Sequence, residues 1–311
     1  MSKLKTIFMG TPDFAVPCLE VLQDKTEILA VITQPDRPKG RGHNMQPSPV
    51  KVKALEYGLP VLQPEKIKTE EFTAELEKMQ PDLIVVVAFG QILSQRILDI
   101  PRLGCVNVHA SLLPRYRGAA PIHWSIINGE KKTGVTTMLM DAGLDTGDML
   151  LKDEVEITSE MTTEELHDKL MAMGGRLLAE TIDGLAEGTI VPEKQDDSLS
   201  NYAGMLKKET GHIDWHKSAQ DIHNLIRGLN SWPVAWSIKD GKNYKFWKAR
   251  SEAGKNDQAP GTVVEIRKNS FCIAAGDGIV EVLEIQPPSK KRMSAGDLIR
   301  GHGVEIGDVF A

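Results

Sequence analysis

Residues 104–147 read GCVNVHASLLPRYRGAAPIHWSIINGEKKTGVTTMLMDAGLDTG and place polar side chains beside two predicted strands. In the first strand, Asn107 and His109 are two positions apart, so their side chains should point to the same face. The second strand, residues 134–141, leads into a loop rich in glycine and aspartate that contains Asp145. Two strands that each end in a polar loop predict the crevice at the carboxyl edge of an open α/β sheet, where such folds bind ligands.

Strands predicted earlier in the chain complete this sheet. Residues 4–9 and 28–33 are predicted strands with a helical segment between them. Residues 82–89 (DLIVVVAF) form the near-continuous apolar run expected of a central parallel strand. The segment that follows it, with Gly90 and Ile92, should open at the same edge as His109. The turn after the first strand lacks the G-x-G-x-x-G pattern, so the sequence does not support a nicotinamide or flavin dinucleotide site.

The pattern changes in the last third of the chain. Short strands separated by turn signals predict a small β-barrel or sandwich. The polar, proline-containing stretch before them reads as a linker. We therefore expect an α/β, Rossmann-like domain with a parallel-rich sheet over residues 1–188, a linker over 189–208, and a small β-barrel domain over 209–311.

The distribution of charge differs between these parts. The chain of 311 residues carries a formal net charge of −6. From Glu209 onward, however, 14 Lys and Arg oppose 13 Asp and Glu, which leaves 23 against 30 in the first two-thirds. Lys245 and Lys248 lie in a basic cluster among aromatic residues of one predicted strand. Such a strand is either a solubilising surface or a contact for phosphate groups, which carry no sequence information.

The three cysteines are far apart in the sequence, so they form no zinc-binding pair, and we expect each to be a buried core residue. An odd and sparse cysteine count is typical of a reducing compartment. No stretch has the roughly 20 apolar residues of a membrane span, and the start of the chain has too short an apolar run for a signal peptide. These features predict a cytoplasmic protein.

A long basic loop, residues 34–47 (QPDRPKGRGHNMQP), follows the second strand. Loops of this length without periodicity are often functional, and arginine suits phosphate contact. Arg37, Lys39 and Arg41 are its candidate phosphate ligands. The alternative is a plain solvated surface loop.

The chemistry of the polar cluster points to acyl transfer. An asparagine amide can donate to an oxygen that gains negative charge, a histidine can donate or move a proton, and an aspartate can orient the histidine. No serine or cysteine has the setting of a nucleophile, and no metal-ligand spacing occurs. Taken singly, His109 could be a structural hydrogen-bonding residue and Asp145 a turn former. Together they favour direct transfer of an acyl group onto an amine.

The N-x-H motif at Asn107 and His109, the following SLLPRYRGAAP, and D-x-G-x-D-T-G-D over residues 141–148 resemble the folate-dependent formyltransferases. The resemblance extends to residues 9–14 (MGTPDF) and to the part of the chain after Glu209. It implies a Rossmann-like first domain and an OB-fold-like second one. It also implies transfer of formyl from 10-formyltetrahydrofolate, consumed as a cosubstrate without a metal, to the methionine amine of initiator methionyl-tRNA.

The resemblance also assigns site residues. It implies that Asn107, His109 and Asp145 are catalytic. The folate-binding residues that we expect are Ser111, Leu112, Leu113, Pro114, Phe89, Gly90, Ile92 and Asp141. With the charge pattern it implies tRNA contacts by Arg37, Lys39, Arg41, Lys245 and Lys248.

Three alternatives remain open at this point. The first is a formyltransferase that acts on an amino sugar nucleotide, and the second is a formyl-folate hydrolase. The third is an RNA-binding module whose cleft has no activity. The basic loop and the basic, aromatic C-terminal strand favour tRNA as the acceptor, and we expect the protein to act as a monomer.

Overall fold

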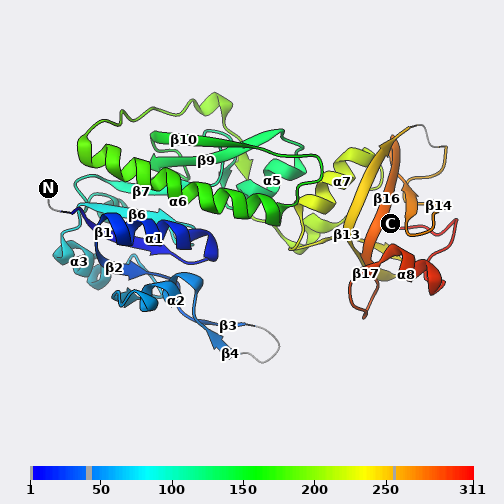
Figure 1. The fold of residues 1–311 in the computed structure, drawn as a ribbon, viewed down its shortest axis with the longest axis horizontal. Helices are drawn as coiled ribbons and strands as arrows, with labels where there is room; N and C mark the ends of the chain where they lie inside the picture. Colours follow the sequence, from blue (N-terminus) through cyan, green and yellow to red (C-terminus); the bar gives the residue numbers. More distant parts are fainter. Residues whose placement is uncertain (1–2, 40–43, 255–256) are drawn as a thin grey trace. The chain divides into compact units, whose positions relative to one another are not determined.

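The computed structural model describes residues 3–39, 44–254 and 257–311 (Figure 1). These residues form two compact units that interleave along the chain. The first unit comprises Met1–Gly118, Thr133–Val155 and His167–Ala203, and the second comprises Ala119–Lys132, Glu156–Leu166 and Gly204–Ala311. The stretch predicted as a linker, 189–208, therefore contributes residues to both units.

A seven-stranded sheet is the centre of the first unit. Its strand order is β10-β9-β7-β6-β1-β2-β5, and all pairs from β7 to β5 are parallel. These strands are β1 (Lys5–Gly10), β2 (Glu27–Ile32), β5 (Val61–Leu62), β6 (Leu83–Val87), β7 (Cys105–His109), β9 (Lys132–Leu139) and β10 (Met149–Glu156). The apolar run predicted as a central strand is β6, and all five of its residues are buried.

Helices cover both faces of this sheet. On one face, Ile84 and Val86 of β6 pack in a core with Leu76 and Ile97 of the helices α3 and α4. On the other, α1 and α6 lie side by side (Figure 1), and a Cβ at Gly175 would approach Pro17 within 3.0 Å. The helices of this unit are α1 (Val16–Lys25), α2 (Pro49–Glu56), α3 (Glu70–Met79), α4 (Gln95–Leu98) and, from His167 onward, α6 (Thr163–Glu187).

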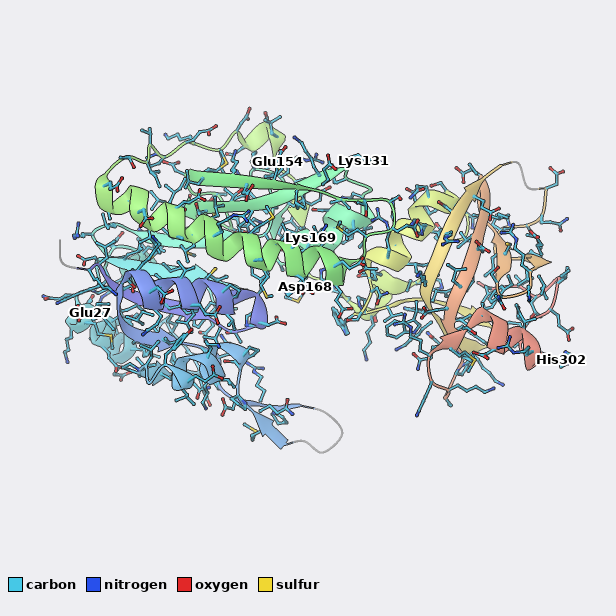
Figure 2. All side chains as sticks on the ribbon, viewed as in Figure 1. Glu27, Lys131, Glu154, Asp168, Lys169 and His302 are labelled. Atoms are coloured by element: carbon cyan, nitrogen blue, oxygen red, sulfur yellow. The ribbon has the colours of Figure 1, made fainter. Side chains whose placement is uncertain are left out.

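The longest helix, α6, shows why the sequence forms an amphipathic element there. Leu166 and Leu170, four positions apart, are fully buried, while Asp168 and Lys169 on the same turns are exposed and extend from the helix (Figure 2). No helix in the described part of the chain is both long and apolar enough to cross a membrane.

The basic loop contains two short strands, β3 (Arg37–Lys39) and β4 (Asn44–Gln46), which pair antiparallel. The base of this hairpin is fixed at Asp36, whose carboxylate accepts hydrogen bonds from Lys51 (2.7 Å) and Gln63 (2.8 Å). These two contacts hold the pKa of Asp36 below its usual value. Arg41 and the side chain of Lys39 lie outside what the structure describes.

Antiparallel strands form the sheet of the second unit, in the order β12-β13-β16-β15-β14, with β17 beside β16. The strands are β12 (Ala235–Lys239), β13 (Lys242–Ala253), β14 (Val263–Ile266), β15 (Phe271–Ala274), β16 (Gly278–Gln286) and β17 (Met293–Ser294). The helices α5 (Pro121–Ile127), α7 (Ala219–Gly228) and α8 (Ala295–Arg300) belong to the same unit. The predicted fold class, a parallel-rich α/β domain followed by an antiparallel β domain, is confirmed.

Residues 307–311 join the two edges of this antiparallel sheet. On one side the Phe310 N–H donates to the carbonyl of Gly261, beside β14. On the other, Ala311 and Ile238 of β12 exchange two backbone hydrogen bonds of 2.8 and 2.9 Å. Part of the backbone of each edge strand is thereby paired, which shortens the exposed edges. Phe310, 1% exposed, fills the interior against Trp215, Tyr244, Phe246 and Phe271.

We predict that Phe310→Ala lowers the free energy of unfolding by about 3–5 kcal/mol, because it leaves a cavity where four aromatic rings converge. Urea unfolding measures this change. The matched control is Val309→Ala, since Val309 is 54% exposed and should change stability by no more than about 0.5 kcal/mol. Equal effects of the two substitutions would contradict the packing role of Phe310.

Candidate active site

Strand β7 places Asn107 and His109 on the same face of the sheet, as their spacing predicts. Both side chains approach Asp145 of the loop between β9 and β10. The Asn107 Nδ2 lies 3.4 Å from Asp145 Oδ1, and the His109 Nδ1 lies 3.7 Å from Asp145 Oδ2. His109 is 6% exposed, so water screens these groups weakly. The three residues predicted as catalytic therefore form one cluster.

The backbone carbonyl of Tyr116 determines which nitrogen of His109 carries a proton. His109 Nε2 lies 2.9 Å from this oxygen, and a carbonyl can only accept a hydrogen bond. The Nε2 must therefore be protonated, which leaves Nδ1 as the nitrogen that can gain or lose a proton. Nδ1 is the nitrogen that faces Asp145. At 3.7 Å the contact is too long for a hydrogen bond, so in this state the carboxylate acts on the ring through its charge.

The Asp145 carboxylate is itself held by a backbone group. Its Oδ2 accepts a 2.8 Å hydrogen bond from the Gly118 N–H. Gly118 has φ +113°, and a Cβ there would lie 2.5 Å from the Tyr202 ring, so only glycine fits. Asp145 also has a positive φ of 53°, a conformation that aspartate tolerates better than most residues.

The position of Asp145 corrects one sequence-based prediction. We expected the ends of both strands at a single carboxyl edge, but β9 runs antiparallel to β7, with Leu139 opposite Val106. The loop after β9 therefore starts near the amino end of β7 and must return along the strand to bring Asp145 to His109. Gly147 permits this close path, since a Cβ there would lie 1.7 Å from the Leu139 carbonyl oxygen.

The segment predicted to bind folate, residues 111–114, follows β7 directly. Thr136 of β9 fixes it, because its hydroxyl donates to the Ser111 carbonyl (2.7 Å) and accepts from the Leu113 N–H (3.1 Å). The side chains of Ser111 and Leu113 are buried, while those of Leu112 and Pro114 are partly exposed. A ligand at this segment would therefore meet backbone groups and the latter two side chains.

The other residues predicted to bind folate lie in two places. Phe89 and Gly90 follow β6 and line a hollow together with Arg37 of β3. Ile92 is 69% exposed, a high value for a large apolar side chain. Asp141 begins the loop of Asp145 and stabilises it internally, since its carboxylate accepts from the Gly143 N–H and the Thr146 hydroxyl. The structure thus brings a predicted tRNA contact, Arg37, to the same hollow as two predicted folate contacts.

The predicted tRNA contacts of the second unit lie on β13. Lys245 and Lys248 are exposed, and in the described part of the chain neither forms an ion pair. Between them Phe246 is fully buried, so this strand presents its lysines to solvent and its aromatic ring to the core.

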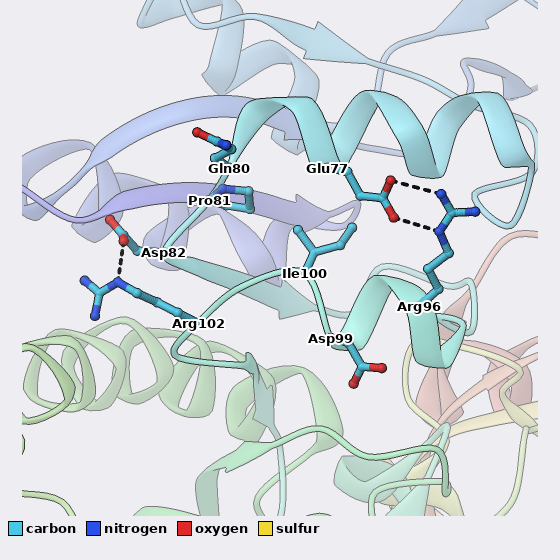
Figure 3. Close-up of a pocket in the computed structure, with 8 residues that line it drawn as sticks. All are labelled: Glu77, Gln80, Pro81, Asp82, Arg96, Asp99, Ile100 and Arg102. Atoms are coloured by element: carbon cyan, nitrogen blue, oxygen red, sulfur yellow. Dashed lines mark hydrogen bonds and ion pairs between the residues drawn. The ribbon is translucent and has the colours of Figure 1, made fainter.

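A second hollow of the first unit lies at the opposite, amino edge of the sheet. Figure 3 shows its charged side chains, among them Glu77 with Arg96 and Asp82 with Arg102. In each of these pairs the arginine neutralises the carboxylate. None of the predicted site residues lines this hollow. We therefore assign no ligand to it.

The three cysteines of the chain are buried and free. Burial raises the pKa of Cys18, Cys105 and Cys272 to about 12. None is a thiolate at neutral pH, so none supplies a nucleophile. Among the described residues, no group of three or more histidine, cysteine or acidic side chains is gathered as a metal site would require.

Sequence reasoning missed several groups that hold this cluster together. The Tyr116 carbonyl and the Gly118 N–H are backbone atoms, whose direction no residue type reveals. Gln195 lies in the stretch predicted as a linker, yet its side chain contacts the loop of Asp145. The only signal for two of these residues, Tyr116 and Gly118, was the RYRG turn after the segment predicted to bind folate.

Comparison with known proteins identifies the family of the chain. The profile of the family "Formyl transferase" matches residues 3–182, and that of "Formyl transferase, C-terminal domain" matches residues 205–303. The chain belongs to the formyl transferase family. Each of the three catalytic candidates lies within the first match.

Members of the family with high sequence identity cover the whole chain. The methionyl-tRNA formyltransferase of Clostridium perfringens strain 13 is 55% identical over 308 residues, which are 99% of this chain and 100% of that protein. The methionyl-tRNA formyltransferase of Citrifermentans bemidjiense is 52% identical over 311 residues, 100% of this chain and 97% of that protein.

Solved structures with a similar fold are more distant in sequence. The sugar 3N-formyl transferase WlaRD, determined with dTDP and 5-N-formyl-THF, has a TM-score of 0.69 at 22% identity over 94% of this chain and 100% of its own. An N-formyltransferase from Helicobacter canadensis, in complex with folinic acid and dTDP-3-aminofucose, has a TM-score of 0.66 at 24% identity over 91% of this chain and 99% of its own. Both support the formyl transferase fold.

For the catalytic cluster we predict that Asn107→Ala and His109→Ala each lower turnover about 10²–10³-fold, the effect expected of losing one oxyanion donor. Asp145→Asn should also be slow, because a neutral amide cannot attract an imidazolium by charge. Steady-state formyl transfer measures these effects. His167→Ala is the matched control, since the ring of His167 packs against Phe14 and lies beside Asp13 and Asp168 rather than against Asp145. Near-normal turnover of any of the three cluster variants would refute the role of that residue.

Proposed function

We propose that the protein transfers the formyl group of 10-formyltetrahydrofolate to the methionine amino group of initiator methionyl-tRNA. The product is the N-formylmethionyl-tRNA used in translation initiation. The observation that carries the proposal is the 55% identity, over 99% of this chain, to a protein named methionyl-tRNA formyltransferase. The cluster of Asn107, His109 and Asp145 supports it chemically, since these groups suit acyl transfer to an amine.

In the proposed reaction the neutral amine attacks the formyl carbon and forms a tetrahedral intermediate with a negatively charged oxygen. The Asn107 Nδ2 donates to this oxygen, and a protonated His109 stabilises it by charge. The bond from the formyl carbon to the folate nitrogen then breaks. The proton lost by the amine passes to that nitrogen, and we propose that Asp145, which faces His109 Nδ1, helps to relay it.

Folate is proposed to lie along residues 111–114 and the loop that contains Asp145. The partly exposed Leu112 and Pro114 and the strongly exposed Ile92 offer apolar surface for a flat ring. Because Thr136 already binds the Ser111 carbonyl and the Leu113 N–H, polar contacts to folate are proposed for the other backbone groups of this segment. Phe89, Gly90 and Asp141 belong to the same proposed site.

The acceptor tRNA is proposed to contact both units. In the first, Arg37 lines the hollow beside Phe89 and Gly90, and we propose that Lys39 and Arg41, which follow it in the sequence, contact phosphates. In the second, the exposed Lys245 and Lys248 of β13 supply further phosphate contacts. These residues should position the tRNA without reading its sequence.

The experiment that tests the function is transfer of labelled formyl from 10-formyltetrahydrofolate by the purified protein to four acceptors offered separately. These are initiator methionyl-tRNA, elongator methionyl-tRNA, uncharged initiator tRNA and a dTDP-amino sugar. Label should enter initiator methionyl-tRNA far faster than the others. Preferred labelling of the sugar nucleotide, or release of free formate alone, would instead establish one of the alternative activities.

We predict that changing Lys245 and Lys248 together to Gln weakens binding of initiator and elongator tRNA alike. The slope of log affinity against log salt should become shallower by about one unit for every phosphate that the variant no longer neutralises. Binding across a salt series measures both. The control is Lys5→Gln with Lys78→Gln, which removes the same charge from exposed positions at the amino end of β1 and the end of α3. An unchanged slope in the Lys245 and Lys248 variant would show that these lysines do not contact phosphates of the tRNA.

A further inference from the structure

Gln195 lies in the stretch between the two predicted domains, and its side chain contacts the loop between β9 and β10. This loop contains Asp145 and is called the catalytic loop below. We propose that Gln195 is a positioning residue, which holds Asp145 at the distance from His109 that formyl transfer requires. The inference rests on the proposed function for its activity readout. It goes further because it assigns a catalytic requirement to a residue outside the motif of residues 104–148.

The amide nitrogen of Gln195 binds the backbone on both sides of Thr146. Its Nε2 donates to the Asp145 carbonyl at 2.8 Å and to the Gly147 carbonyl at 2.7 Å. Both hydrogens of one amide are thus used on a single turn of the catalytic loop. This turn includes Asp145 in its positive-φ conformation, which needs support from its surroundings to persist.

The amide oxygen of Gln195 binds Arg117. It accepts from the Arg117 Nε at 3.0 Å and from the second guanidinium nitrogen at 2.9 Å. A guanidinium only donates and a backbone carbonyl only accepts, so the orientation of the Gln195 amide is fixed without ambiguity. Arg117 is in turn held by Asp197 at 2.7 Å, and its side chain is only 11% exposed.

Gln195 therefore connects the two segments that define the place of the Asp145 carboxylate. One is the loop itself, through its carbonyls. The other is β8 (Arg117–Gly118), whose Gly118 N–H donates to Asp145 Oδ2. β8 is paired with β11 (Tyr202–Ala203), which lies in the same predicted linker, residues 189–208, as Gln195. If the connection is broken, the carboxylate can move relative to His109 although both residues remain.

Glutamate at this position separates a positioning role from a merely structural one. In Gln195→Glu the side chain keeps its length and gains an ion pair with Arg117. Its second carboxylate oxygen would, however, face the carbonyls of Asp145 and Gly147, with no hydrogen to donate to either. Stability should thus be largely retained while the catalytic loop is displaced.

The test compares Gln195→Glu and Gln195→Ala with the parent enzyme and with Gln95→Glu, a control that makes the same charge change at an exposed residue of α4. We expect kcat of both Gln195 variants to fall by about 10²-fold, the effect of misplacing a catalytic group by about 1 Å. The KM for formyl-folate and for tRNA should change less than threefold. The melting temperature of Gln195→Glu should stay near that of the parent.

A second readout does not depend on activity. In protein labelled with ¹⁵N-histidine, the Nδ1 resonance of His109 should shift in Gln195→Glu and not in Gln95→Glu, because it reports the distance to the Asp145 carboxylate. A parent enzyme that fails to formylate tRNA would refute the proposed function and leave this readout intact. A kcat of Gln195→Glu within threefold of the parent, or an unmoved His109 resonance, would overturn the positioning role.

Discussion

The hydrogen bond from the Gly118 N–H to the Asp145 carboxylate is the contact on which the geometry of the site depends. It joins the turn after β7 to the loop after β9, two segments that the sheet alone would not bring together. Asn107 and His109 are placed by the regular geometry of a strand, but Asp145 has no such support. The contacts of His109 with the Tyr116 carbonyl and of Gln195 with the loop of Asp145 then orient the imidazole and keep this carboxylate in place.

The two nitrogens of His109 have different surroundings and different roles. Nε2 is committed to the Tyr116 carbonyl, which fixes the ring, and Nδ1 faces the carboxylate and remains free to exchange a proton. The Asp145 carboxylate lies 3.7 Å from Nδ1, close to the ring but beyond hydrogen-bond distance. Such a ring can stabilise a negatively charged intermediate and still act in proton transfer.

Local sequence patterns predicted the structural features that are determined by residues close together in the chain. The two-residue spacing of Asn107 and His109 indicated their common face, and the apolar run of β6 indicated a central strand. Contacts between distant segments were not predictable in the same way. The direction of β9 depends on which strand it pairs with, and Gln195 reaches Asp145 across 50 positions of the chain. Likewise, nothing in residues 307–311 shows that they join β12 to β14.

The central claim is that Asp145 faces the nitrogen of His109 that exchanges its proton. Long-range ¹H–¹⁵N correlation spectra of protein labelled in its eight histidines test this claim most directly, with His109 assigned by comparison with His109→Gln. We predict that neutral His109 carries its proton on Nε2 and none on Nδ1. A neutral ring protonated on Nδ1 would contradict this claim, because Nε2 could then make no hydrogen bond to the Tyr116 carbonyl.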